Sequence, residues 1–222
     1  MLKIYICFIL GLMLADPVLA AGSSRNVLVS ETVFVAFDTE TTGFSRDKDR
    51  LVEIGVVKFR GDGTVLVTTN WLVNPQREIP FYATEVHGIT TEMAAEAPDF
   101  AKVWPEFEAF CGDAVLLAHN APFDVGFLRA ELERAGIKAP VLPVIDTLPL
   151  FRKWFPHAAS HSLERLTEEL GVSGGTYHRA EADAFHIVNV LSVGMKTRTD
   201  MNLRRFQADA GGYLWLDGRS RP

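Results

Sequence analysis

The stretch that decides the fold of this chain is Phe34-Val35-Ala36-Phe37-Asp38-Thr39-Glu40-Thr41-Thr42-Gly43. Its apolar first half predicts a buried central strand over residues 33–38. Asp38 and Glu40 follow two positions apart, so both side chains point to the same face of the sheet. Two carboxylates on one face repel each other and raise a pKa. They are either unrelated acids at a solvated strand end or metal ligands, and ligands that offer only oxygen favour Mg²⁺ or Mn²⁺.

Two later segments place acids beside apolar runs in the same way. His119-Asn120-Ala121-Pro122-Phe123-Asp124 follows a predicted strand, and His178-Arg179-Ala180-Glu181-Ala182-Asp183 leads into a predicted helix. Considered alone, Asp124 and Asp183 complement the dipole of a helix N-terminus, an effect of about 0.5 kcal/mol each. Considered alone, His178 is a solvated loop residue. The three segments together favour a shared site instead.

The acids Asp38, Glu40, Asp124 and Asp183, if they converge, can hold two metal ions about 3.5–4 Å apart. Such a pair clamps the attacking and leaving oxygens of a phosphodiester and lowers the pKa of a bound water. His178 is then the candidate general base, because an unperturbed histidine has a pKa near ~6.5. The predicted reaction is in-line hydrolysis of a phosphodiester bond.

The rest of the chain predicts one α/β domain. Strands at 51–59 and 65–73 are joined by the tight-turn signal Gly61-Asp62-Gly63, so an antiparallel three-stranded meander opens the fold. Residues 75–98 are expected to form a loop with one short helix, and Pro105 predicts a kink or a restart in the next helix. The later elements are strands at 114–118 and 143–146 and helices at 100–110, 123–135, 148–154, 162–170 and 181–195. This order predicts a mixed sheet flanked by helices, with ligands beyond the strand ends.

Size and charge limit the function further. The 222 residues and the 48% hydrophobic content are ordinary for a globular domain with a core of useful size. The formal net charge of −6 argues against a broad basic surface for long duplex DNA or RNA, but not against nucleic acid held locally through metal ions. Beyond residue 195 the pattern fades, and residues 196–222 are expected to form a weakly basic tail that Tyr213, Leu214 and Trp215 partly order.

The N-terminus has the order of a secretory signal peptide. Met1-Leu2-Lys3 is a short positive start, residues 4–14 are apolar, and small residues follow. The apolar run is shorter than the ~20 residues that span a bilayer, so we expect no stable membrane insertion. We expect a signal peptide over residues 1–20, cleaved after Ala20, and a periplasmic or secreted protein. The alternative is a misread start site, which would leave the protein in the cytoplasm.

On these residues the chain resembles a known family, the DEDD-type 3′→5′ exonucleases with a ribonuclease-H-like fold, in the branch whose third motif carries histidine. The three quoted segments match its three motifs in order, and the exonuclease domain of the epsilon subunit of bacterial DNA polymerase III is the closest likeness. The resemblance covers roughly residues 32–193, and we expect the exonuclease domain to span residues 32–195. Intervening stretches also fit: Glu53-Ile54-Gly55, Val86-His87-Gly88-Ile89-Thr90, Asp146-Thr147-Leu148 and His161-Ser162-Leu163.

The resemblance implies a role for each acid. Asp38, Glu40 and Asp183 would bind the catalytic metal ion. Asp38 and Asp124 would hold a second ion, with Mg²⁺ or Mn²⁺ as the cofactor and two ions per site.

The resemblance also implies contacts to the substrate. Backbone groups of Thr39 and Thr41 would lie near the terminal nucleotide. His87 and Phe123 are candidates for contacts to the 3′ end, or else parts of a loop and of the core. The substrate would be the 3′ end of a single-stranded nucleic acid, DNA favoured over RNA. Protein partners are not implied.

Three functions stay open on the sequence. The first is an exported 3′→5′ exonuclease that releases nucleoside monophosphates. The second is a cytosolic proofreading or repair exonuclease of the polymerase III epsilon type with a misread start, although a signal peptide and a short tail without a clear clamp-binding motif do not fit a replication subunit. The third is a non-catalytic nucleic-acid-binding module. The five site residues speak against it, because a binding module needs neither a metal pair nor a base.

Overall fold

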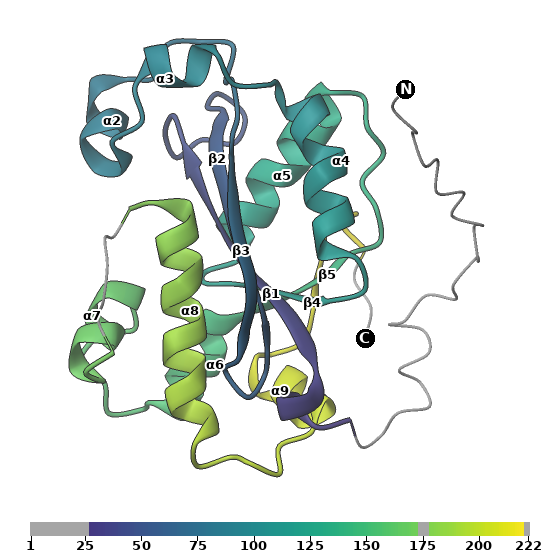
Figure 1. The fold of residues 1–222 in the computed structure, drawn as a ribbon, viewed down its shortest axis with the longest axis vertical. Coiled ribbons are helices and arrows are strands. Elements are labelled where there is room, and N and C mark those ends of the chain that lie inside the picture. The colour runs from purple at the N-terminus through teal and green to yellow at the C-terminus, as the bar shows by residue number, and fades with distance from the viewer. Residues whose placement is uncertain (1–26, 173–177, 220–222) are drawn as a thin grey trace, which may run out of the picture.

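The computed structural model describes residues 27–172 and 178–219 (Figure 1). The signal peptide expected over residues 1–20 lies outside the described residues, as do the last three residues of the expected tail. Within them, a six-stranded mixed sheet runs through the molecule in the order β3-β2-β1-β4-β5-β6, with helices on both faces. The α/β fold class expected from the sequence is confirmed.

Strand β1 lies in the interior of the sheet, between β2 and β4. The strands are β1 (Val33–Thr41), β2 (Leu51–Arg60), β3 (Val65–Leu72), β4 (Val115–Ala118), β5 (Pro143–Asp146) and β6 (Leu214–Trp215). The first three form the predicted antiparallel meander, β4 and β5 extend the sheet in parallel, and β6 closes it antiparallel. Asp38 lies opposite Gly55 and Glu40 opposite Glu53, and a bulge follows between Glu40 and Thr41. The acids of β1 therefore sit where regular pairing ends.

The helices divide between the two faces of the sheet (Figure 1). The short helices are η1 (Val29–Glu31), α2 (Phe81–His87), α3 (Thr91–Ala95), α7 (Leu163–Glu169) and α9 (Leu203–Asp209), and the others are α4 (Phe100–Cys111), α5 (Pro122–Arg134), α6 (Thr147–Trp154) and α8 (Ala180–Met195). Phe34 and Ala36 pack into the core with α6, α8 and α9, whereas Val35 and Phe37 pack into the core with α4 and α5. Because both faces are buried, β1 is apolar without alternation.

This alternation fixes the direction of the polar residues at the end of β1. Asp38 and Glu40 continue the series of Phe34 and Ala36 and point to the face that α8 covers. Thr39 continues the other series and points to the face that α5 covers.

The first turn of α8 lies very close to β2. A Cβ atom on Gly55 would come within 1.9 Å of the Glu181 backbone nitrogen and 2.0 Å of the Ala180 carbonyl carbon. No side chain fits in that space, so the residue opposite Asp38 has to be glycine for α8 to reach the sheet.

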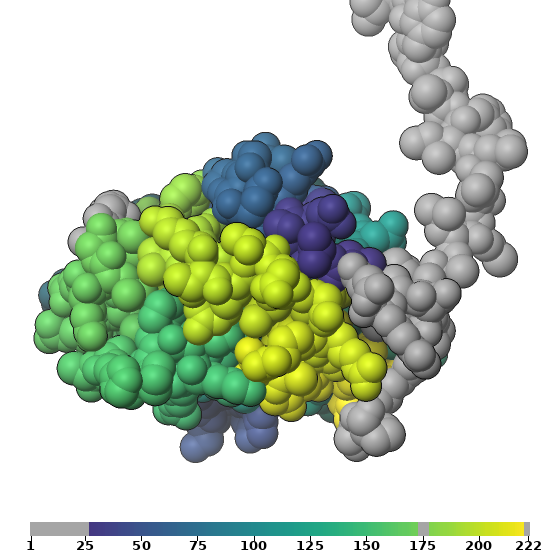
Figure 2. Space-filling model, turned by 90° about the horizontal axis from the view of Figure 1, so that it is seen from below, coloured from purple at the N-terminus to yellow at the C-terminus, as the bar shows by residue number. Residues whose placement is uncertain are grey.

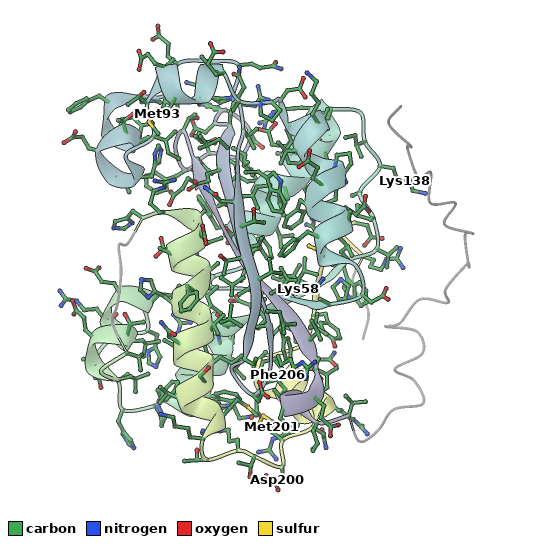
Figure 3. All side chains as sticks on the ribbon, viewed as in Figure 1. Lys58, Met93, Lys138, Asp200, Met201 and Phe206 are labelled. Atoms are coloured by element: carbon green, nitrogen blue, oxygen red, sulfur yellow. The ribbon has the colours of Figure 1, made fainter. Side chains whose placement is uncertain are left out.

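The chain after residue 195 differs from the expected tail. Leu203–Asp209 forms α9, whose Phe206 is fully buried with its ring 5.6 Å from that of Phe34, and β6 pairs with β5. Figure 3 shows Phe206 of this segment beside the lower end of the sheet, and Figure 2 shows the segment at the surface seen from below. Residues 203–215 therefore contribute to the same sheet and core as the domain expected over residues 32–195. The sequence hides this because a seven-residue helix and a two-residue strand carry almost no periodicity.

Two further expectations need correction. Residues 75–98 hold two short helices, α2 and α3, rather than one. The helix α4 runs through Pro105 without a restart. In the described part of the chain, no helix combines the length and the apolar character that a bilayer crossing requires.

Candidate active site

Three of the four predicted metal ligands meet at the end of β1. Asp38, Glu40 and Asp183 each offer a carboxylate oxygen, and these oxygens lie within 4.8 Å of one another. Asp38 and Glu40 come from the strand, and Asp183 comes from the first turn of α8 on the same face of the sheet. Carboxylate oxygens at this spacing fit a hard divalent cation such as Mg²⁺ or Mn²⁺.

The fourth acid, Asp124, approaches β1 from the other face. Pro122 opens α5, which suits the first position of a helix, and Asp124 follows in the first turn. Its carboxylate is 2% exposed and accepts a hydrogen bond of 2.7 Å from the Thr39 hydroxyl. Asp124 does not belong to the group of three, but its charge acts on Asp38. The structure thus brings three acids into one cluster and holds the fourth beside it.

Burial raises the pKa of each of these carboxyl groups above its ordinary value when no cation is bound. Burial raises the pKa of Asp38 well above its ordinary value, and the charges of Asp124 and Asp183 raise it further. Burial and then the charge of Asp183 raise the pKa of Glu40 to about 8. Burial raises the pKa of Asp124 to about 7, although the hydrogen bond from Thr39 opposes the rise. Burial also raises the pKa of Asp183. The cluster therefore lacks positive charge, which divalent cations would supply.

His178 is held beside Asp183 by an uncommon backbone conformation. Its φ of 61° lies in the left-handed region, which costs energy for a residue other than glycine. In this conformation the His178 N–H donates a hydrogen bond of 2.9 Å to Asp183 Oδ2. His178 is exposed and lines both of the hollows that adjoin the acids. The candidate base is thus anchored to a candidate ligand through its backbone.

The two hollows differ in character. The first, here called the apolar pocket, has a volume of about 310 Å³, and its lining includes Thr39, Thr41, Phe44, Tyr82, His87 and Phe123. The second, here called the polar cleft, has a volume of about 580 Å³, and its lining includes Asp38, Asn120, Arg152, His161, Ser162 and Asp183. The Phe44 side chain is 87% exposed with its ring 6.5 Å from that of Phe123. Exposed rings of this kind suit the stacking of a nucleobase.

All four residues that the sequence proposed as substrate contacts line the apolar pocket: Thr39, Thr41, His87 and Phe123. His87 is buried, and its Nδ1 accepts a hydrogen bond of 3.1 Å from the Ile89 N–H. Its Nε2 lies near the Thr41 backbone but makes no hydrogen bond of normal geometry within the described residues. His87 and Phe123 thus serve the local packing and border the pocket at once.

Glu53 is a site residue that the sequence did not single out. It is fully buried on β2 and accepts hydrogen bonds from Arg179 Nη2 at 2.8 Å, from the Ala180 N–H at 3.1 Å and from Asn70 Nδ2 at 2.6 Å. Burial alone would raise its pKa, but the hydrogen bonds from Arg179 and Asn70 outweigh burial and lower it. The ionised Glu53 carboxylate therefore ties the start of α8 to the sheet.

This tie positions the cluster. The first turn of α8 carries Asp183 and directly follows His178, so the hydrogen bond from Ala180 to Glu53 fixes both relative to β1. The signal in the sequence was an acid inside an otherwise apolar central strand, Leu51-Val52-Glu53-Ile54, where an unpaired charge is hardly ever buried.

Comparison with known proteins adds to this geometry. Residues 35–191 match the family model described as Exonuclease. The PolC-type DNA polymerase III of Clostridium perfringens is 40% identical over 163 residues, which are 73% of this chain and 11% of that protein. The PolC-type DNA polymerase III of Bacillus cereus is 34% identical over 203 residues, which are 88% of this chain and 14% of that protein. The chain thus spans only a small part of the length of these polymerases.

Solved structures are similar as well. Exonuclease X, solved in complex with 5′ overhanging duplex DNA, is 27% identical with a TM-score of 0.64, over 80% of this chain and 99% of that chain. The nuclease domain of 3′hExo, a DEDDh family member solved with rAMP, is 14% identical with a TM-score of 0.68, over 80% of this chain and 98% of that chain. The second likeness shows the fold alone, and both confirm the expected ribonuclease-H-like sheet.

We expect the metal-free protein to lose stability as the pH rises from about 4.5 to about 8. The Glu40 carboxyl has an ordinary pKa of 4.5 and a pKa of about 8 in the fold. The folded state therefore binds more protons than the unfolded state in this range, and the free energy of unfolding falls with rising pH. Asp38→Asn removes one of the repelling charges and should flatten this fall. Urea unfolding in EDTA at several pH values measures both, and parallel curves for wild type and variant would contradict the assignment.

We expect Glu53→Gln to raise the concentration of Mn²⁺ needed for half-saturation of the acid cluster by about tenfold, because outer-shell partners orient metal ligands. Calorimetric titration of Mn²⁺ into the folded variant measures this. Glu131→Gln is the matched control: Glu131 is also buried and paired with an arginine, Arg50 at 2.7 Å, but it does not touch α8. Both variants should lose stability, and only the first should lose metal affinity. Equal Mn²⁺ affinities in the two variants would refute the positioning role of Glu53.

Proposed function

This chain belongs to the exonuclease family and is a DEDD-type 3′→5′ exonuclease, and from this premise we propose that it uses two divalent cations to hydrolyse single-stranded DNA and that it is exported. The observation that carries the metal proposal is the convergence of carboxylate oxygens from Asp38, Glu40 and Asp183 within 4.8 Å. Their raised pKa values mark a site that lacks positive charge. Oxygen-only ligands make Mg²⁺ or Mn²⁺ the fitting cofactor.

The residues divide the work as follows. Asp38, Glu40 and Asp183 would hold one cation, and Asp38 and Asp124 would hold the second. Two bound cations would activate the attacking water and neutralise charge on the attacking and leaving oxygens. His178 takes the proton from the water. The water oxygen forms a bond to phosphorus as the bond from phosphorus to the 3′ oxygen of the penultimate nucleotide breaks. The 3′ oxygen takes a proton from solvent water, and a nucleoside 5′-monophosphate leaves.

The apolar pocket is the proposed place of the terminal nucleoside. Phe123 stacks on its base, backbone groups of Thr39 and Thr41 contact its sugar, and His87 borders the 3′ end from below the pocket floor. The Thr39 hydroxyl is already engaged with Asp124, so side chain and backbone of this residue serve different partners. Support for DNA as the substrate comes from the relatives, which are named as DNA polymerases, and from exonuclease X, whose structure holds DNA. The 3′hExo structure holds a ribonucleotide, so RNA is the alternative substrate and has to be tested beside DNA.

Export is supported by the sequence of residues 1–20 alone. The mature protein would then act in the periplasm or outside the cell, in clearance or salvage of nucleic acid. The second candidate is a cytosolic proofreading or repair exonuclease, which the likeness to PolC-type DNA polymerase III favours. N-terminal sequencing of the protein made in cells separates the two, because a mature start at Ala21 supports export and an intact or later start contradicts it.

We expect the purified chain to shorten 5′-labelled single-stranded DNA from its 3′ end in Mg²⁺ or Mn²⁺ and to stop in EDTA. Denaturing gels of the DNA and of a matched RNA measure the ladder, and the faster substrate settles the sugar preference. Asp183→Asn, with an unchanged circular dichroism spectrum, should yield no ladder because the metal cluster loses a ligand. A ladder of normal rate in EDTA or in this variant would refute the two-metal site.

We expect His178→Ala to lower turnover by about 10²-fold, the typical contribution of a general base, while Mn²⁺ binding is retained. The shape of the pH–rate profile should change when the imidazole is removed. Single-turnover rates across the pH range measure this, and calorimetric titration checks the metal. A variant that is slow but keeps the wild-type profile shape would show that another group accepts the proton.

A further inference from the structure

The polar cleft is lined by a cation that has no ion-pair partner among the described residues, Arg152. Arg152 stands on α6 four residues after Leu148, so both side chains share one face of the helix, and both line the cleft. Arg152 is exposed, and no acid in residues 27–172 or 178–219 lies within ion-pair distance of it. Lys153, the next residue, turns to another side of the helix and pairs with Asp209 at 2.6 Å. Of these two cations on α6, Lys153 therefore stabilises the fold through an ion pair, and Arg152 lines the cleft.

The wall around Arg152 is rigid. His119 Nε2–H donates a hydrogen bond of 2.8 Å to the His161 carbonyl, and its Nδ1 lies 3.0 Å from the Thr147 hydroxyl. The ring stacks on Phe151 at 5.6 Å, and burial lowers the His119 pKa to about 4, so the imidazole is neutral and structural. These contacts join the ends of β4 and β5 to the segment before α7 and fix the base from which Arg152 extends.

The remaining lining of the cleft is suited to a sugar-phosphate chain. Asn120 is exposed with a left-handed backbone, φ 59°, and Ser160 and Ser162 add hydroxyl groups. Glu164 is the one acid among the lining residues outside the metal cluster, and it forms no ion pair with Arg152. Polar donors around a guanidinium form a surface for a phosphate rather than for a base.

The position of the cleft sets the direction in which a substrate runs. This step rests on the proposed function: the scissile phosphate lies at Asp38 and Asp183, and the terminal nucleoside lies in the apolar pocket. His178 lines both hollows, so they meet at the acids. A strand that ends in the apolar pocket therefore continues toward its 5′ end through the polar cleft.

We propose that Arg152 binds a backbone phosphate of the substrate strand on the 5′ side of the scissile phosphate. The guanidinium is always charged and forms bidentate hydrogen bonds with phosphate. This contact makes the enzyme select a polynucleotide over a mononucleotide ester, although both carry the same scissile group.

The test compares two substrates in wild type and Arg152→Gln. One is single-stranded oligothymidylate, and the other is the p-nitrophenyl ester of thymidine 5′-monophosphate, which has a scissile phosphodiester and no phosphate beyond it. Arg152→Gln should raise KM for the oligonucleotide about tenfold, the effect of one hydrogen-bonded charge, with little change in kcat. Hydrolysis of the ester should be unchanged. Arg152→Lys should restore part of the affinity, because it keeps the charge and loses the bidentate geometry.

Lys138→Gln is the matched control, since Lys138 is exposed on the far side of the molecule from α7 and loses the same charge (Figure 3). It should behave as wild type. A second measurement follows binding of the labelled oligonucleotide by fluorescence anisotropy with Ca²⁺ over a range of salt. Arg152→Gln should reduce the slope of log K against log salt by about 0.7, the loss of one phosphate contact on a single strand.

The outcomes separate the inference from the function on which it rests. Wild type that hydrolyses neither substrate refutes the proposed function, and the anisotropy slopes then still decide whether Arg152 binds a phosphate. Wild type that hydrolyses both, with Arg152→Gln equal to it on the oligonucleotide, refutes the inference alone. An equal loss on both substrates also refutes it, because the ester has no phosphate for Arg152 to bind.

Discussion

The site depends on one distance, that between the sheet and the first turn of α8. Glu53 sets it from one side, because its carboxylate accepts hydrogen bonds from Arg179 and the Ala180 N–H. Gly55 sets it from the other, because any side chain there would collide with the backbone of α8. Asp183 lies one turn farther along, so its distance to the acids of β1 follows from these two residues of β2. Strand β1 carries two of the three acids of the cluster, but residues of the neighbouring strand β2 set their distance to the third.

Two glutamates on adjacent strands have pKa values shifted in opposite directions. Glu40 of β1 and Glu53 of β2 are partners in register. Hydrogen bonds from Arg179 and Asn70 overcome burial at Glu53 and lower its pKa, whereas burial and the charge of Asp183 raise the pKa of Glu40 to about 8. The environments differ because Arg179 forms an ion pair with Glu53, whereas burial outweighs the charge of Arg179 at Glu40. Environments that push the pKa values of two neighbouring carboxyl groups apart in this way are typical of active sites.

The sequence predicted what depends on local pattern and missed what depends on register. The apolar run before Asp38 and the two-residue spacing to Glu40 were enough for β1 and its acids, and the glycine turn was enough for the meander. The role of Glu53 needs the pairing of β1 with β2 and the approach of α8, which no single segment contains. The left-handed backbone of His178 was not foreseen either, because histidine gives no such signal. The pairing of β6 with β5 was not foreseen either, since β6 is only two residues long.

The net negative charge of this chain repels a nucleic acid, so the positions of its cationic side chains matter for binding. The net charge is −6, and several arginines are used inside the fold: Arg50 pairs with Glu131, Arg179 with Glu53 and Arg205 with Asp209. Attraction for the substrate cannot come from the surface as a whole, so it has to come from bound cations at the acids and from single side chains such as Arg152. The two sources act on different phosphates. In the proposed mechanism, cations at the acids would neutralise the phosphate that is cut, and Arg152 would hold one that is not cut. Recognition of the strand would then be coupled to the chemistry without a basic surface.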